Sequence, residues 1–375
     1  METAILKSKE DRRLLRGHLW AYRNEFAKLP RVSDGEVVDI QSDRGRFIGR
    51  GFYQSEGGIG VRILTRRDNE TVDAAFLARR VARAKRYRDR LYPGENVYRW
   101  VYGESDGLPG LVVDRYGPVV VAQSSCQFYA QYAEILAKAF QEHEGVTGVK
   151  LTLPGVDKRV GEVPDAMEVS IGGLQFTVNL AEGQKTGIFL DQRENCWALR
   201  PLAHGAKVLD GHCYAGQWSC HFAAAGAASV LGVDTSAPAI ERARANAERN
   251  GVADRCVFES ASIAEVLQRG ERYDVVLLDP PALAKTRAQA TKAAGLYQAL
   301  NRDALLAVEP GGYLVTSSCS HFVDKADFVE ILKRAARAAQ RDAWVVEERG
   351  AAKDHPILLA MPETEYLKCV VLRVF

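Results

Sequence analysis

Two short motifs in the last third of the sequence carry side chains that could perform chemistry together. Asp279-Pro280-Pro281 follows one apolar run, and Ser317-Ser-Cys-Ser320 ends the next. The prolines lack N–H groups and stiffen their loop, which holds the carboxylate and carbonyl of Asp279 outward as acceptors for a base edge. A thiolate at Cys319 could add to C6 of a pyrimidine and so make C5 nucleophilic. We therefore predict that Cys319, Asp279 and Pro280 form a catalytic group.

The cysteine pattern leaves a simpler interpretation of Cys319 open. The seven cysteines are scattered, their number is odd, and no C-x-x-C pair occurs, so neither a disulfide framework nor a metal site is expected. Most free cysteines are small buried side chains, and Cys319 could be one of them. Cys213 competes with it for the role of nucleophile, but we interpret Cys213 as packing beneath a ligand.

A ligand site is predicted where an apolar strand ends at Asp210 and continues into Gly-His-Cys-Tyr-Ala-Gly-Gln-Trp-Ser219. Gly216 would let the backbone approach a ligand, because it has no Cβ. Asp234, at the end of the next strand, could bind two ribose hydroxyls. The loop lacks the full G-x-G-x-x-G pattern, which favours a ligand without a pyrophosphate. S-adenosylmethionine (SAM) is such a ligand.

The C-terminal half has the alternation of strands and helices that builds a doubly wound α/β sheet. Strands are predicted at 207–210, 229–234, 255–258, 273–279 and 312–317, and helices at 237–250, 291–308 and 325–341. Two further strands, at 343–347 and 367–375, close the chain.

The N-terminal half is organised differently. Short apolar runs at 36–40, 46–50 and 60–64, separated by glycines, predict a small β-barrel or sandwich. A helix is expected at 71–91, strands at 110–114 and 119–122, a helix from about 129 to 143, and a hairpin within 163–181. The predicted domains are therefore 1–69, 70–174 and 175–375, and 375 residues suit two or three domains.

Composition limits the class of protein. The first nine residues are polar, unlike a signal peptide, and no apolar run approaches the roughly 20 residues that cross a bilayer, so no membrane contact and a cytoplasmic location are expected. The net charge of +2 requires any basic surface to be local. Candidate phosphate contacts are Arg12, Arg13, Arg16, Arg79, Arg83 and Arg86, although a solvated surface remains the simpler interpretation of each.

Several spaced motifs resemble the large-subunit ribosomal RNA methyltransferases of the RlmI type, which methylate C5 of a cytidine in 23S rRNA. The resemblance covers nearly the whole chain. Besides Asp279-Pro-Pro281 and Ser318-Cys-Ser320, the motifs are Arg16-Gly-His-Leu-Trp-Ala-Tyr-Arg-Asn-Glu25, Gly103-Glu-Ser-Asp-Gly-Leu-Pro-Gly110, Gln184-Lys-Thr-Gly-Ile-Phe-Leu-Asp-Gln-Arg193, Asp354-His-Pro356 and Tyr366-Leu-Lys368.

This resemblance implies an N-terminal PUA RNA-binding domain, a central α+β domain and a class I, Rossmann-like methyltransferase domain with a reversed last strand. It implies SAM as cofactor, large-subunit ribosomal RNA as partner, and Cys319 as the group that attacks C6; a homodimer is left open. The implied cofactor-binding residues are Thr186, Phe189, Asp191, Gln192, Asp210, Cys213, Tyr214, Gly216, Asp234, Thr235, Ser262 and Asp279.

Two positions depart from the family pattern. His212 stands where the family usually has phenylalanine, and Ser262 lies where an acid usually accepts a hydrogen bond from the adenine amino group. Ser262 or a backbone carbonyl would have to replace that acid. These two residues keep open a second interpretation, an RNA-binding assembly factor without turnover. Methylation of guanine N7, which related methyltransferases perform and which needs no cysteine, is a further alternative.

Overall fold

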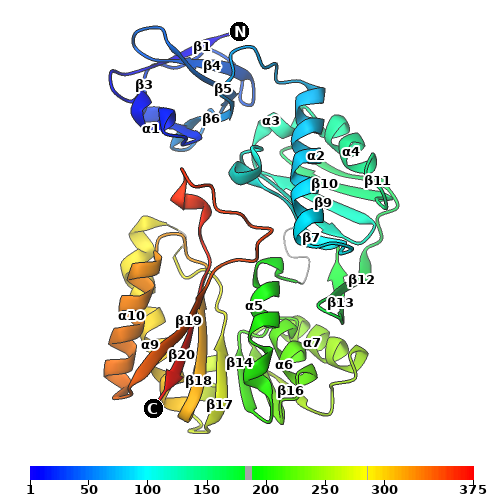
Figure 1. The fold of residues 1–375 in the computed structure, drawn as a ribbon, viewed down its shortest axis with the longest axis vertical. Coiled ribbons are helices and arrows are strands. Elements are labelled where there is room, and N and C mark those ends of the chain that lie inside the picture. Colours follow the sequence, from blue (N-terminus) through cyan, green and yellow to red (C-terminus); the bar gives the residue numbers. More distant parts are fainter. Residues whose placement is uncertain (182–187, 285) are drawn as a thin grey trace. The chain divides into compact units, whose positions relative to one another are not determined.

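The computed structural model describes residues 1–181, 188–284 and 286–375, and the chain forms two compact units. The first unit contains Met1–Asp165 together with Lys353–Thr364. The second contains Ala166–Ala352 and Glu365–Phe375. Figure 1 shows the ribbon of both units, and each is described by itself below.

The first unit begins with a six-stranded sheet in the order β2-β6-β5-β4-β1-β3, in which only β1 and β4 are parallel neighbours. Buried and less buried residues alternate along its shorter strands, as expected where one face of a sheet covers a core. The strands are β1 (Thr3–Leu6), β2 (Trp20–Tyr22), β3 (Phe26–Lys28), β4 (Val37–Gln41), β5 (Phe47–Tyr53) and β6 (Ile59–Thr65), with helix α1 at Asp11–Leu15.

The rest of this unit is a five-stranded sheet in the order β11-β10-β9-β8-β7, with helices α2 (Ala74–Leu91) and α4 (Ala133–Gln141) packed together on it (Figure 1). The side chain of Asp73 starts α2 by accepting a hydrogen bond from Phe76 N at 2.8 Å. The single helix expected at 129–143 is instead divided into α3 (Gln127–Ala130) and α4. The strands are β7 (Val97–Tyr102), β8 (Leu111–Tyr116), β9 (Val119–Ser124), β10 (Gly148–Leu153) and β11 (Val156–Gly161).

The second unit is built on a seven-stranded sheet in the order β16-β15-β14-β17-β18-β20-β19. The first five of these strands are parallel, whereas β20 runs antiparallel to both β18 and β19. This confirms the predicted doubly wound sheet and its reversed last strand. The strands are β14 (Lys207–Gly211), β15 (Ser229–Asp234), β16 (Cys256–Ser260), β17 (Tyr273–Leu278), β18 (Val308–Ser318), β19 (Ala343–Arg349) and β20 (Lys368–Val374).

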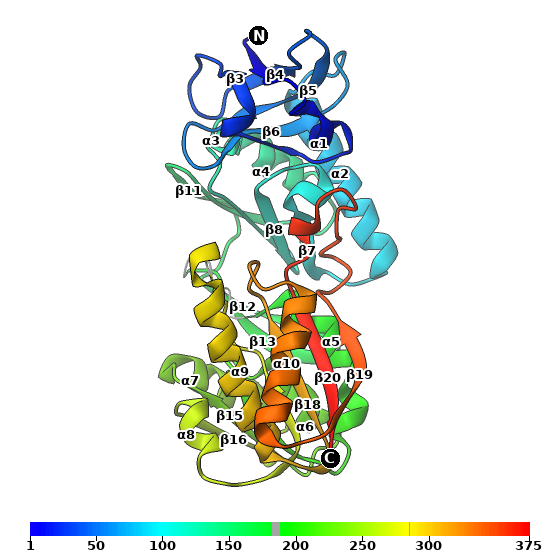
Figure 2. The same ribbon diagram turned by 90° about the vertical axis from the view of Figure 1, so that its left-hand side faces the viewer.

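Helices cover both faces of this sheet. Figures 1 and 2 show α9 and α10 side by side on one face, and Figure 1 shows α6 and α7 on the other. The helices are α5 (Arg193–Ala198), α6 (Gln217–Ala224), α7 (Ala237–Arg249), α8 (Ile263–Leu267), α9 (Ala290–Ala307) and α10 (Lys325–Ala339). A separate hairpin, β12 (Ala166–Ile171) and β13 (Leu174–Asn179), precedes them.

The two units do not follow the predicted domain boundaries. A cut between residues 174 and 175 would separate β12 from β13, although the two strands pair with each other and lie in the same unit. The first unit also includes residues 353–364 from the far end of the chain. The division into three domains stays a prediction.

Candidate active site

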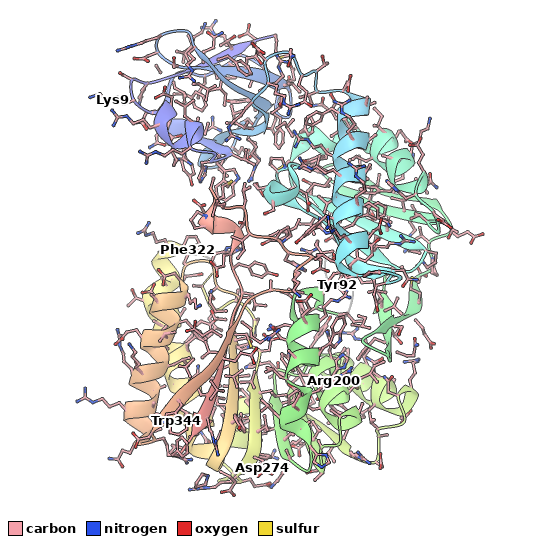
Figure 3. The ribbon with its side chains drawn as sticks, in the orientation of Figure 1. Lys9, Tyr92, Arg200, Asp274, Phe322 and Trp344 are labelled. Carbon is pink, nitrogen blue, oxygen red and sulfur yellow. The ribbon has the colours of Figure 1, made fainter. Side chains whose placement is uncertain are left out.

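The strand ends of the second unit gather polar side chains at one edge of the sheet. Gly211 at the end of β14 pairs with Val233 of β15 and with Leu278 of β17, so Asp210, Asp234 and Asp279 emerge at neighbouring strand ends. Figure 3 labels Asp274, at the opposite end of β17, and Phe322, in the turn that follows β18. In an open α/β sheet the carboxyl ends of the strands are where ligands bind.

The loop after β14 has a strained backbone. His212 and Tyr214 have φ values of 63° and 49°, which non-glycine residues rarely adopt. The carboxylate of Asp234 stabilises this conformation, because it accepts hydrogen bonds from Tyr214 N at 3.1 Å and from Ser236 N at 2.9 Å. Strain of this kind persists where the surrounding structure fixes the backbone, often at functional sites.

Gly216 begins α6 with a backbone conformation that favours glycine. It has a φ of 77° at the start of α6, and an added Cβ would lie 3.0 Å from the Cβ of Ala243 and 3.3 Å from Phe258. Gly216 is therefore required for the turn and for close packing of α6 on α7, and it does not line the cavity described next.

A small cavity opens beside this loop. Five of the predicted cofactor-binding residues line it, together with His212, Ala215, Gln217 and Trp218: Phe189, Gln192, Cys213, Tyr214 and Asp279. The rings of Phe189 and Tyr214 have centroids 5.3 Å apart. The side-chain Nε2 of Gln217 is buried and has no hydrogen-bond partner among the described residues, so it is available to a ligand.

The other predicted cofactor-binding residues lie outside the lining of this cavity. Asp191 accepts a hydrogen bond from the hydroxyl of Tyr366 at 2.5 Å, and Asp210 is buried and accepts one from Ser219 at 2.6 Å. Ser262 caps α8 by accepting a bond from Ala264 N, and Thr235 is exposed. Thr186 lies outside the described residues.

The site is strongly acidic. Burial raises the pKa of both Asp210 and Asp279 from 3.8 to about 7, and the carboxylates around them add to the rise. Gln192 donates from Nε2 to Asp279 Oδ1 at 2.9 Å and to Ser317 Oγ at 3.1 Å, which ties the loop after β17 to the end of β18. The described residues that line the cavity include no lysine or arginine, so a cationic ligand would relieve the repulsion between these carboxylates.

Cys319 lies beside Asp279-Pro-Pro281, as predicted, with its Sγ 3.8 Å from the carbonyl oxygen of Pro280. It is partly exposed, whereas Cys213 is buried. Burial, followed by the charges of Asp279 and Asp191, raises the pKa of the Cys319 thiol to about 12. The thiol is therefore protonated in this state.

A positively charged side chain that the sequence motifs did not assign to the site lies near Cys319. Lys368 in β20 donates from Nζ to the carbonyl oxygens of Ser320 and Tyr366, each at 2.8 Å. Burial lowers the pKa of Lys368 to about 8, and its positive charge lowers the pKa of Cys319. The motif Tyr366-Leu-Lys368 was visible in the sequence, but antiparallel pairing of β18 with β20 is what brings it to Cys319.

The predicted RNA-contacting arginines lie in the first unit and differ in their surroundings. Arg79, Arg83 and Arg86 line one large cavity, and Arg12 and Arg16 are exposed at α1. Arg13 is held inside its own unit, because it donates to both carboxylate oxygens of Glu25, at 2.7 and 2.9 Å, and to Trp20 O at 2.8 Å. It is therefore poorly placed to contact phosphate.

Two findings limit other classes of site. Among the described residues, no group of three or more histidine, cysteine or acidic side chains could hold a metal ion. Within the same residues, no helix combines the length and apolar character that crossing a membrane requires.

Comparison with known proteins places this site in a family context. A PUA-like domain model matches residues 4–66, and an S-adenosylmethionine-dependent methyltransferase model matches residues 155–357. The ribosomal RNA large subunit methyltransferase I of Shewanella denitrificans is 35% identical over 99% of this chain and 98% of its own length. The protein of the same name from Shewanella amazonensis is 36% identical over the same shares.

Solved structures share the fold at lower identity. The crystal structure of the methyltransferase SMU.776 complexed with SAH matches with a TM-score of 0.90 and 20% identity, and covers 100% of both chains. A SAM-dependent methyltransferase from Streptococcus mutans matches with a TM-score of 0.87 and 19% identity over the same shares.

Proposed function

Because this chain belongs to the family of S-adenosylmethionine-dependent methyltransferases that carry an N-terminal PUA-like domain, we propose that it methylates C5 of a cytidine in large-subunit ribosomal RNA. The observation that supports the base and the atom is the position of Cys319, whose Sγ lies 3.8 Å from Pro280 O at the end of the neighbouring strand. Such a substrate also favours a cytoplasmic location.

The residues at the strand ends fit SAM. Its sulfonium and ammonium groups are cationic, and such charges would favour the ionised forms of Asp210 and Asp279, whose pKa burial raises to about 7. Asp234 suits the ribose hydroxyls, Phe189 and Tyr214 suit the apolar parts of the molecule, and Gln217 offers a buried N–H. When bound, SAM supplies a methyl group on a positively charged sulfur.

The protein's own residues would act on the pyrimidine ring. The target base must leave its stack to reach a cleft of this kind. The Cys319 thiol releases its proton to solvent, and its Sγ then forms a bond to C6. The π-electron pair of the C5=C6 double bond moves to C5, which becomes the nucleophile that accepts the methyl group. A base then removes the C5 proton, and the Sγ–C6 bond breaks to regenerate the cysteine. Lys368 stabilises the thiolate, since its charge lowers the pKa of Cys319.

The test uses labelled SAM and ribosomal RNA from cells that lack the gene. Turnover should fall by at least about a thousandfold in Cys319→Ala, since removal of a nucleophile eliminates the covalent route. Cys256→Ala is the matched control, because Cys256 is also a partly exposed free cysteine but lies on β16. SAM binding, measured by calorimetry, should be unchanged in both variants.

The products distinguish this proposal from its alternatives. Label at C5 of cytosine is the expected result. Full activity of Cys319→Ala with label on guanine would replace the proposal by guanine-N7 methylation. SAM binding without any turnover on ribosomal RNA would favour an assembly factor.

A further inference from the structure

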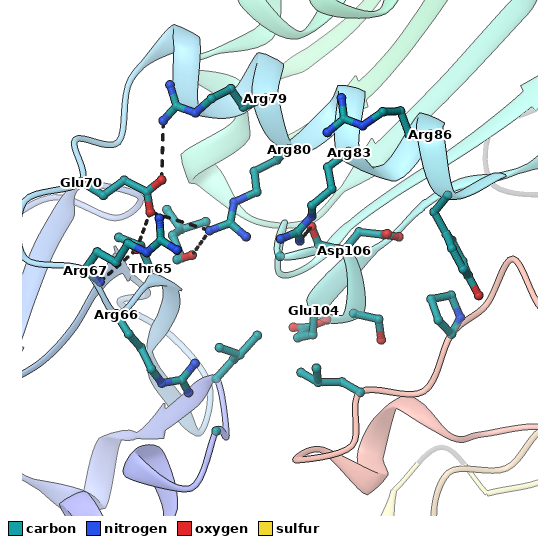
Figure 4. A pocket seen from close by; sticks show the side chains of 18 residues that line it. Thr65, Arg66, Arg67, Glu70, Arg79, Arg80, Arg83, Arg86, Glu104 and Asp106 are labelled. Atoms are coloured by element: carbon teal, nitrogen blue, oxygen red, sulfur yellow. Dashed lines mark hydrogen bonds and ion pairs between the residues drawn. The ribbon is translucent and has the colours of Figure 1, made fainter. Parts of the chain in front are cut away.

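The first unit contains a large cavity, whose lining residues all belong to that unit. Its volume is about 860 Å³, which is within the range of roughly 300–1,000 Å³ typical of ligand sites. Helix α2, the segment after β6 and the turn at residues 104–107 form its walls, and Pro356 and Leu358 complete it. Figure 4 shows the arginines of α2 and of the segment after β6 around this space.

The charge of this cavity is strongly unbalanced. Six arginines line it: Arg66, Arg67, Arg79, Arg80, Arg83 and Arg86. Of the three acids in the lining, Glu104 pairs with Arg62 at 2.5 Å and Asp106 with Arg88 at 2.6 Å, and neither of these partners lines the cavity. Glu70 alone remains to neutralise the six guanidinium groups.

Glu70 does not balance that charge. It accepts a hydrogen bond from Thr65 Oγ1 at 2.6 Å and lies 3.5 Å from Arg79 and 3.9 Å from Arg80 (Figure 4). Burial and the nearby Arg83 lower the pKa of Arg80, as expected where like charges crowd together. A concave surface with this excess of guanidinium groups would attract a ligand that carries more than one negative charge.

Part of the lining is apolar. Leu19, Leu64, Pro356, Leu358 and the ring of Tyr87 share the cavity with the arginines. A ligand that matches this lining carries both anionic groups and flat or apolar groups. An unstacked nucleotide chain has this character, whereas a paired helix presents mainly its phosphates and turns its bases inward.

We propose that this cavity binds single-stranded RNA, with backbone phosphates at Arg79, Arg83 and Arg86 and an unstacked base against Pro356 and Leu358. Guanidinium groups suit phosphate, because they can donate two parallel hydrogen bonds to it. The inference rests on the proposed RNA substrate. It adds a second RNA-binding site, which takes no part in the chemistry at Cys319. It also assigns the arginines a role beyond a solvated surface.

The test compares two arginines of the same helix. Arg86 and Arg90 are both exposed on α2, but only Arg86 lines the cavity. Arg86→Gln should raise the Kd for a fluorescent single-stranded oligoribonucleotide about tenfold, as expected for one charged hydrogen bond. Arg90→Gln should leave the Kd within about twofold. The slope of log Kd against log salt concentration should fall by about 0.7 in Arg86→Gln.

A second variant should act in the opposite direction. Glu70→Gln removes the one lining carboxylate that pairs with arginines of the cavity, and the glutamine can still accept the hydrogen bond from Thr65. The affinity for the same oligonucleotide should therefore increase. Equal effects of Arg86→Gln and Arg90→Gln, or tighter binding of a duplex of the same length, would overturn the proposal. So would unchanged binding by Glu70→Gln.

Binding and turnover separate this inference from the proposed function. Arg86→Gln should have an unchanged kcat, because the cavity contributes no group to the chemistry. Its KM for RNA should be raised, because the RNA binds more weakly. If the oligonucleotide results hold but the label appears on another base, the proposed reaction fails and the RNA site stands. If Cys319→Ala abolishes turnover but Arg86→Gln and Arg90→Gln have the same Kd, the proposed RNA site is wrong and the proposed reaction stands.

Discussion

The Cys319 thiol is surrounded by groups with opposing effects on its ionisation. Burial, Asp279 and Asp191 raise its pKa, and the charge of Lys368 lowers it. Burial therefore acts on this thiol in the same direction as the carboxylates that suit a cationic cofactor, and together they favour its protonated form. A ligand cation beside Asp279 would offset their effect on the thiol as well.

Replacement of Lys368 should show this balance directly. In Lys368→Met the pKa of Cys319 should rise further, so alkylation of Cys319 by iodoacetamide should be slower than in the wild type. Because the pKa of Lys368 is about 8, its charge is present below pH 8 and is lost as the pH rises through that value. The difference in alkylation rate between Lys368→Met and the wild type should therefore decrease above pH 8.

Mass spectrometry of the peptide that contains Cys319 gives the alkylation rate at each pH. Lys333→Met is the control, because Lys333 is an exposed lysine of α10 and should leave the rate unchanged. A rate deficit in Lys368→Met that is the same at every pH would show a structural effect of the substitution and would exclude the electrostatic role.

At the scale of elements, the sequence predicted the sheet of the second unit because its signals are local. Apolar runs of the length of β14, β15 and β17 alternate with amphipathic helices, and this pattern is sufficient for the fold and for the positions of Asp234, Asp279 and Cys319. It could not show that Gly216 packs on Ala243, nor that Lys368 lies near Cys319. Those contacts depend on helix packing and on pairing between strands far apart in the sequence.

Helix α2 contains one arginine that contributes to stability rather than to binding. The side chain of Arg88 is fully buried and donates to Asp106 at 2.6 Å, to Arg99 O at 2.8 Å and to Asp354 O at 2.6 Å. Arg88→Met would leave the buried carboxylate of Asp106 without its ion pair. Breaking such a pair typically costs about 3–5 kcal/mol in the free energy of unfolding.

Urea denaturation of Arg88→Met should measure this loss. Arg90→Met is the matched control, since Arg90 is exposed on the same helix, and its free energy of unfolding should change by less than about 0.5 kcal/mol. The double variant Arg88→Met/Asp106→Leu should recover part of the loss, because it also removes the unpaired charge. Equal stabilities of the two single variants would contradict the assignment.

At the scale of the whole chain, residues 353–364 leave the unit of their neighbours and complete the other one. The side chain of Asp354 accepts a hydrogen bond from Arg99 N at 2.9 Å, and Glu363 pairs with His18 at 3.1 Å. Met361 joins the core of the six-stranded sheet, where Leu19 N lies 3.4 Å from its Sδ. These partners lie more than 250 residues away in the sequence, so no local pattern could predict the exchange.

Two side chains of this segment provide a direct test of its contribution. Met361 is 0% exposed and Leu359 is 98% exposed, although they are two residues apart. Met361→Ala should lower the free energy of unfolding of the first unit by about 2–5 kcal/mol, because it leaves a cavity in a packed core. Leu359→Ala should have little effect. Hydrogen exchange should increase in β1, β4 and β6 of Met361→Ala, while the affinity for SAM should stay that of the wild type. Equal stabilities of the two variants would mean that the N-terminal sheet forms its core without the C-terminal segment.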